Sequence, residues 1–137
     1  MSKLIWKTEK RLVKDLLPAG YNPRKMTESE RKALEDSVKE FGAVVPVVAN
    51  TGKRKNVIIG GHQRVTIYAD LGIEEVDVMI PSRELTKDEE KKLNLRLNKN
   101  VGSWDFAKLK EFNLEMLVEV GFEKSDLSVE IGISDAE

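Results

Sequence analysis

Five consecutive residues, Gly60 to Arg64, combine groups well suited to binding a phosphate. They follow the apolar run Val57–Ile59 and precede a segment with helical spacing, so they lie where a strand gives way to a helix. Glycines let the backbone turn sharply there, and the first N–H groups of the helix point outward with partial positive charge. Arg64 adds a planar, permanently charged group. The segment predicts an anion site made by Gly60, Gly61, His62, Gln63 and Arg64; the plainer interpretation is a turn with a surface arginine.

His62 is the only histidine of the chain, which contains no cysteine. An imidazole at a helix start can contact a phosphate, act as a general acid or base, or form one structural hydrogen bond. The positive end of a helix disfavours its protonation. These three roles stay open, and His62 is the one catalytic candidate. Thiolate chemistry and a multi-histidine zinc centre are excluded, and no metal site is expected.

The surrounding sequence predicts alternating strands and helices that position this segment. Thr27 and Glu30 have the spacing of a capping box, and Gly42 ends the helix that follows. Gly72 supplies a stop after the helix that begins at the glycine segment. The expected elements are a strand or strand pair over 3–13, a helix over 27–41, strands over 44–49 and 57–59, a helix over 61–71 and a strand over 75–80.

Beyond Pro81 the sequence changes to charged, helical patterns. A second capping box, Thr86–Glu89, opens a helix with a narrow apolar face, and Asp105 can cap a last helix that is expected to run to about Val120. A helix-turn-helix over 86–120 is disfavoured, because its second helix is more acidic than basic. We expect an α+β fold, with a small mixed sheet and helices in residues 1–81 and a helical extension, 82–137, packed on it. The expected apolar face of the first of these helices consists of Leu93, Leu95 and Leu97.

The charges are unevenly distributed along the chain. Residues 1–64 contain 14 basic and 7 acidic side chains, whereas residues 65–137 contain 9 and 17. The basic half is suited to nucleic acid or nucleotide phosphates, and the acidic half to a basic partner or to solvation. Lys53, Arg54 and Lys55 form the tip of an expected hairpin, which is either solvated or in contact with a nucleic-acid backbone. The polar composition and the start of the chain predict a cytoplasmic protein without a membrane partner.

The order and spacing of these motifs resemble the N-terminal domain of the ParB superfamily, which also includes sulfiredoxin. The resemblance spans roughly residues 11 to 80. A looser likeness continues through Leu97–Asn100 and Trp104–Asp105, as in stand-alone ParB-like proteins of phages or of DNA methyltransferase neighbourhoods. The motifs that carry it are Asn22-Pro23-Arg24, Val38–Gly42, Val44–Val48, Val57–Arg64 and Leu71-Gly72.

The resemblance implies a sulfiredoxin-like nucleotide fold that binds CTP or ATP with Mg²⁺. Gly61 and Arg64 match the phosphate-binding segment of the partition proteins, but His62 and Gln63 replace its glutamate and first arginine. The catalytic cysteine of sulfiredoxin is likewise replaced by His62, which excludes its chemistry. Arg24 is expected to flank the nucleotide, and Asn98 or Asn100 to close over it.

Three functions follow from these observations. The first is a nucleotide- or DNA-binding accessory protein in DNA transactions, with a nucleotide phosphate at Gly60–Arg64. The second is a protein-interaction module, or homo-oligomer, with a vestigial pocket. The third is an enzyme, either a weak NTPase or a metal-dependent nuclease. Phosphodiester cleavage normally requires carboxylates that hold a divalent cation, and the nearest in sequence, Asp70 and Glu74, lie at or beyond the far end of the helix.

Overall fold

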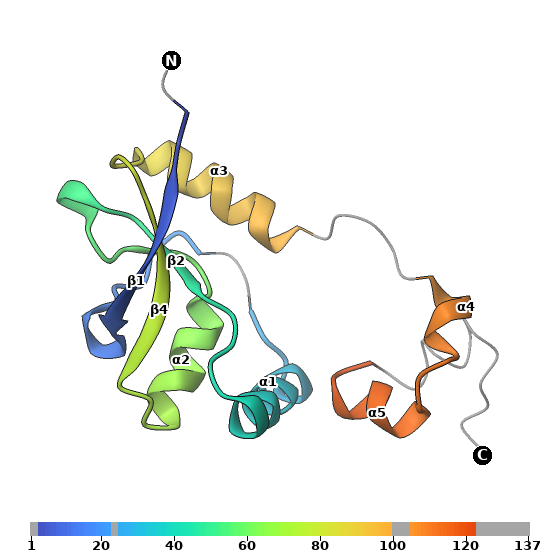
Figure 1. The fold of residues 1–137 in the computed structure, drawn as a ribbon. Coiled ribbons are helices and arrows are strands. Elements are labelled where there is room, and N and C mark those ends of the chain that lie inside the picture. The colour runs from blue at the N-terminus through green and yellow to red at the C-terminus, as the bar shows by residue number, and fades with distance from the viewer. Residues whose placement is uncertain (1–2, 23–24, 100–104, 123–137) are drawn as a thin grey trace.

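A four-stranded mixed sheet forms the centre of the computed structural model, which describes residues 3–22, 25–99 and 105–122 (Figure 1). The strand order is β1-β4-β2-β3. Strand β4 pairs antiparallel with β1 and parallel with β2, and β2 pairs antiparallel with β3. The architecture confirms the predicted α+β class. The strands are β1 (Trp6–Leu12), β2 (Val47–Ala49), β3 (Ile58–Gly60) and β4 (Glu75–Pro81).

The region expected to hold a strand or strand pair, 3–13, contains the single edge strand β1. It pairs with β4 over its whole length, from Trp6 opposite Pro81 to Leu12 opposite Glu75. A short 3-10 turn (η1, Val13–Asp15) follows it. Strand β2 begins only at Val47, later than predicted, since Val44 is 69% exposed and does not join the sheet. A second 3-10 turn (η2, Gly52–Arg54) lies between β2 and β3, which form the expected antiparallel pair.

Helices α1 (Glu28–Phe41) and α2 (His62–Asp70) complete the core and contact each other. Both halves of the predicted Thr27–Glu30 capping box are present, and Gly42 ends α1 at a φ of 83°. An ion pair between Arg31 and Asp70 joins the two helices. The buried apolar core includes Val38, Val47, Ala49, Ile58, Ile67, Tyr68, Val76, Val78 and Ile80.

Helix α3 (Lys87–Asn98) packs against β3 and begins at the predicted Thr86–Glu89 capping box. The prediction that Leu93, Leu95 and Leu97 form its apolar face is wrong in part. Leu95 and Leu97 are 58% and 50% exposed, whereas Glu90 and Asn94 are buried. The helix is turned so that polar groups meet the core, because segments distant in sequence supply their hydrogen-bond partners.

The last predicted helix is two short helices, α4 (Phe106–Leu109) and α5 (Leu114–Glu119). Asp105 caps α4 as expected, but the side chain of Asn113 accepts a hydrogen bond from the Glu115 N–H at 2.7 Å and starts a new helix. Leu109 and Leu117 form a small separate apolar cluster with neighbouring side chains. In the described part of the chain, no helix has the length and apolar character needed to cross a membrane.

Candidate functional site

The junction between β3 and α2 exposes unused backbone donors. Gly61 is the N-cap residue of α2 and has a φ of +95°, a left-handed conformation that favours glycine. Its carbonyl accepts from the Val65 N–H at 2.9 Å, but no side chain caps the helix. Within the described residues, the N–H groups of His62, Gln63 and Arg64 have no acceptor. This helix start therefore has the free donors and partial positive charge of an anion site.

The two glycines serve different purposes. A Cβ on Gly60 would lie 2.8 Å from Cδ1 of Leu97, so Gly60 lets α3 approach β3 closely. A Cβ on Gly61 would make only ordinary contacts with Val47, and glycine is favoured there by the positive φ. Gly61 thus shapes the helix start, whereas Gly60 acts through the packing of α3.

A cleft of about 1320 Å³ opens in front of this helix start. It lies between α1, the beginning of α2, the end of α3 and the segment after α5. All five residues of the predicted phosphate segment line it, as does Asn98 from α3, whose Nδ2 donates to the Asn94 carbonyl at 2.9 Å. The structure therefore places Asn98 in the same cleft as the phosphate segment. Arg24 and Asn100 lie outside the described residues.

Two polar side chains of the segment are available in this cleft. Arg64 is partly exposed and has no ion-pair partner within the described residues. Nε2 of Gln63 is buried without a hydrogen-bond partner, which is costly unless a further group supplies an acceptor. The opposite wall is acidic, so a bound anion is best placed at the α2 end. Its carboxylates are Glu30, Asp36, Glu40 and Glu119.

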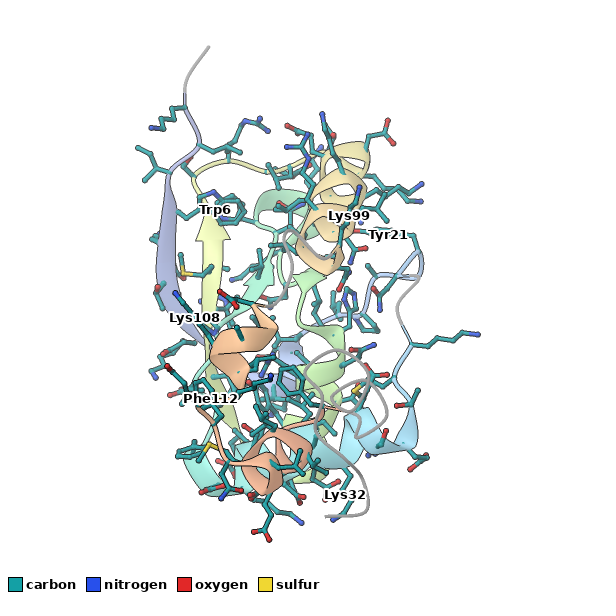
Figure 2. The ribbon with its side chains drawn as sticks, turned by 90° about the vertical axis from the view of Figure 1, so that its right-hand side faces the viewer. Trp6, Tyr21, Lys32, Lys99, Lys108 and Phe112 are labelled. Atoms are coloured by element: carbon teal, nitrogen blue, oxygen red, sulfur yellow. The ribbon has the colours of Figure 1, made fainter. Side chains whose placement is uncertain are left out.

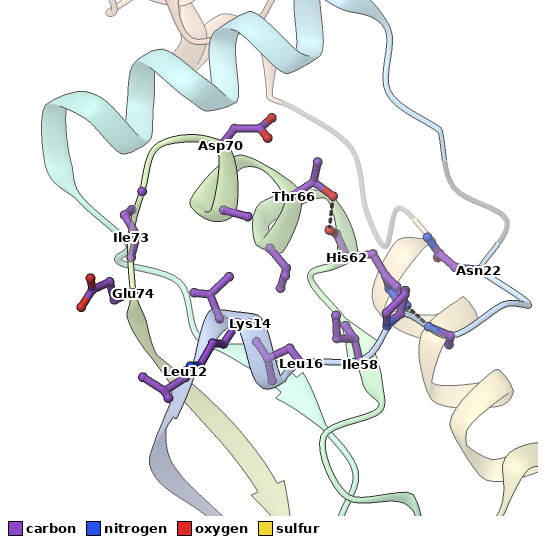
Figure 3. A pocket seen from close by; sticks show the side chains of 16 residues that line it. Leu12, Lys14, Leu16, Asn22, Ile58, His62, Thr66, Asp70, Ile73 and Glu74 are labelled. Carbon is purple, nitrogen blue, oxygen red and sulfur yellow. Dashed lines mark hydrogen bonds between the residues drawn. The ribbon is translucent and has the colours of Figure 1, made fainter.

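His62 is used internally. Its Nε2 accepts a hydrogen bond from the Ala19 N–H at 3.1 Å, and partial burial lowers the pKa of the imidazole. A lone pair on Nε2 requires the proton to lie elsewhere, so the ring is neutral with the proton on Nδ1. Of the three roles left open by the sequence, the structure supplies the structural hydrogen bond. His62 also borders a second cavity of about 1000 Å³ on the other side of α2 (Figure 3).

We expect this hydrogen bond to make stability depend on pH. Because the folded pKa of His62 is lowered, its contribution is complete above the unfolded value, near 6.5, and is lost as pH falls through the folded pKa. Chemical unfolding of the wild type and of His62→Gln across this window would measure it. The glutamine can accept from Ala19 but does not titrate, so its stability should fall less on acidification. Parallel profiles would contradict the assignment.

The predicted hairpin tip contains a buried polar network. Nε and one terminal nitrogen of Arg54 donate to the Glu90 carboxylate at 2.5 and 2.8 Å, and the Tyr21 hydroxyl donates to it at 3.0 Å. Asn50 donates as well. Arg54 is therefore committed to an internal carboxylate, whereas Lys53 and Lys55 are exposed, and their contact with nucleic acid stays a prediction. The sequence did not predict this network. Its one local signal is that Glu90 and Asn94, four positions apart, lie on the same side of α3.

The charge state of Glu90 follows from these contacts. Burial raises the pKa of its carboxyl, but the hydrogen bonds from Arg54, Asn50 and Tyr21 outweigh that effect and leave the pKa below its ordinary value. Glu90 is thus an ionised group inside the fold. Burial and the same hydrogen bond raise the pKa of Tyr21. The network joins α3 to the hairpin loop and to the segment that leads to Asn22, which lines the cleft.

Comparisons with known proteins identify the fold. The model of the ParB N-terminal domain family matches residues 8–101, more than half of the chain. The chain belongs to the ParB N-terminal domain family. No curated protein matches it.

Three solved structures show the same fold. The C-terminally truncated chromosome-partitioning protein ParB from Caulobacter crescentus complexed with CTP-γ-S has a TM-score of 0.67 at 16% identity, covering 95% of this chain and 81% of that chain. The same protein complexed to the centromeric parS site has a TM-score of 0.55 at 15% identity, covering 93% and 73%. The pNOB8-like ParB N-domain has a TM-score of 0.59 at 24% identity, covering 72% and 36%.

Proposed function

We propose that this protein is a ParB-like accessory protein of DNA transactions that binds the phosphates of a nucleotide at Gly60–Arg64. The observation that carries the proposal is the uncapped start of α2, where three N–H groups and the Arg64 guanidinium lack partners among the described residues. Convergent backbone donors and one cation are a common arrangement for phosphate recognition. Membership of a family with a structure containing CTP-γ-S supports the nucleotide, and one containing parS supports DNA.

The residues present fit a nucleoside triphosphate. The cleft volume of about 1320 Å³ is ample for one. The amides of His62–Arg64 would hold phosphate oxygens, and Arg64 would neutralise charge. Asn98 would offer polar contacts at the α3 wall. Asn100 and Arg24 remain proposed as a further closing residue and a flanking cation.

The described residues give less support to catalysis. They contain no group of three or more histidine or acidic side chains placed to hold a metal ion. Mg²⁺ usually binds through one or two carboxylates together with substrate phosphates, so we propose that it enters with CTP or ATP. No specific observation favours the nuclease interpretation.

Calorimetric titration with CTP, ATP, GTP and UTP, with and without Mg²⁺, tests the proposal. We expect saturable heat from at least one nucleotide with the wild type, and its loss with Arg64→Ala. Lys39→Ala is the matched control, because it removes an exposed cation of α1, and neither Lys39 nor its partner Glu35 is a wall residue of the cleft. No heat from any nucleotide would instead favour an interaction module with a vestigial pocket.

A further inference from the structure

The outward face of α3 carries four basic side chains, together with one acidic side chain, Asp88, and the exposed Leu95. Residues 91–99 contain Lys91, Lys92, Arg96 and Lys99 and no acidic side chain. All four are exposed, whereas Glu90 and Asn94 are buried on the opposite side of the helix. With 3.6 residues per turn, the four positions fall within an arc of about 140°. Figure 2 shows Lys99 at the C-terminal end of the helix.

These four cations are not neutralised internally. Many basic residues elsewhere form ion pairs, such as Lys10 with Asp77 at 2.7 Å and Arg83 with Glu89 at 2.8 Å. Within the described ranges, none of the four on α3 has an ion-pair partner. Nζ of Lys91 lies 5.8 Å from the centroid of the Tyr21 ring, a contact that leaves its charge uncompensated by an anion. The face is thus open to an external anion.

Helix stability alone does not account for this pattern. Cations in the last turn of a helix interact favourably with its dipole, which explains Arg96 and Lys99. Lys91 and Lys92 lie about one turn after the start of α3, where that benefit is absent. A neutral protein partner is disfavoured too, because burying unpaired charges is costly. A polyanion matches the face best.

We propose that this face of α3 contacts the phosphate backbone of duplex DNA. Lys91 to Lys99 span about 12 Å along the helix, and duplex DNA carries one charge per about 1.7 Å of its axis, so several phosphates come within reach. Lys53 and Lys55 are further exposed cations, on a loop that the Arg54–Glu90 pair fixes to α3. The contact reads backbone charge and not sequence. The inference rests on the DNA-binding part of the proposed function and adds its surface.

Anisotropy of a labelled duplex, titrated from about 50 mM to about 200 mM salt, tests the proposal. For Lys92→Ala/Arg96→Ala, we expect weaker binding and a slope of log K against log salt that is shallower by about 2. Lys32→Ala/Lys39→Ala removes the same charge from α1 and should keep the wild-type slope. Circular dichroism checks that each variant is folded.

Three outcomes would overturn the proposal. In the first, the wild type does not bind the duplex. In the second, the slope of log K against log salt becomes shallower by the same amount in both double variants. In the third, the wild type binds only to phosphatidylserine vesicles. The nucleotide site is tested separately: Arg64→Ala should lose nucleotide heat and keep the DNA slope of the wild type without nucleotide. Lys92→Ala/Arg96→Ala should keep the nucleotide heat. Failure of one activity is therefore distinguishable from failure of the other.

Discussion

Glu90→Ala is expected to lower the free energy of unfolding by about 3 kcal/mol, the lower end of the range for breaking a buried ion pair. The side chain is fully buried and accepts hydrogen bonds from Arg54, Tyr21 and Asn50. Its removal leaves these donors without their acceptor and opens a cavity. Arg54 is about one-third exposed and can turn towards water, which keeps the loss at the lower end. Urea unfolding at neutral pH measures the difference.

The acid dependence provides a second measurement of the same group. Because the folded pKa of Glu90 is lowered, its stabilisation is complete above the unfolded carboxyl pKa, near 4.5, and is lost as pH falls through the folded value. The difference in the free energy of unfolding between the wild type and Glu90→Ala should therefore become smaller as the pH falls. Glu35→Ala, which removes a surface carboxylate paired with Lys39 on α1, is the control and should cost much less. Equal losses from both variants would refute a central role for the Glu90 network.

Arg64→Glu is expected to weaken nucleotide binding by more than about 100-fold. Loss of a charge-assisted hydrogen bond to phosphate costs about 1.5–3 kcal/mol, and the new carboxylate adds repulsion. Because Arg64 has no ion-pair partner among the described residues, the fold itself should barely change. Competition against a fluorescent nucleotide gives the affinity, and thermal unfolding without nucleotide gives the stability.

Arg64→Lys distinguishes charge from shape at this position. Lysine keeps the positive charge but lacks the planar group that binds two oxygens together, so we expect affinity between those of the wild type and Arg64→Glu. If Arg64→Glu bound nucleotide as tightly as the wild type, the phosphates could not lie at the start of α2. A large loss of thermal stability in Arg64→Glu would show that the Arg64 guanidinium stabilises the fold, which its lack of an ion-pair partner among the described residues does not predict.

The parts of the fold that depend on local signals could be predicted from the sequence. The two capping boxes place the starts of α1 and α3, and the Gly60–Arg64 segment starts a helix at the cleft. The break before α5 also has a local signal, because Asn113 is a favourable N-cap residue. The apolar residues on both sides of this break are spaced as in one continuous helix, so the sequence predicts a single helix there.

The unpredicted features depend on contacts between distant segments. Arg54 and Glu90 are 36 positions apart, and Ala19 and His62 are 43 apart. From the local sequence, Arg54 fits an exposed hairpin tip and His62 fits a catalytic site. In the fold, Arg54 has Glu90 as an internal partner and His62 has the Ala19 N–H. For the candidate site, residue types indicated phosphate chemistry, whereas the availability of Arg64 and the commitment of His62 required the tertiary structure.

The burial of α3 has a consequence for its dynamics. Separating the helix from β3 would break the hydrogen bond from Asn94 to the Ile59 carbonyl and the contacts of the fully buried Glu90. Openings that break buried contacts have higher free energies than the fraying of short exposed helices. Backbone amides in the middle of α3 should therefore exchange with deuterium more slowly than those of the four-residue helix α4.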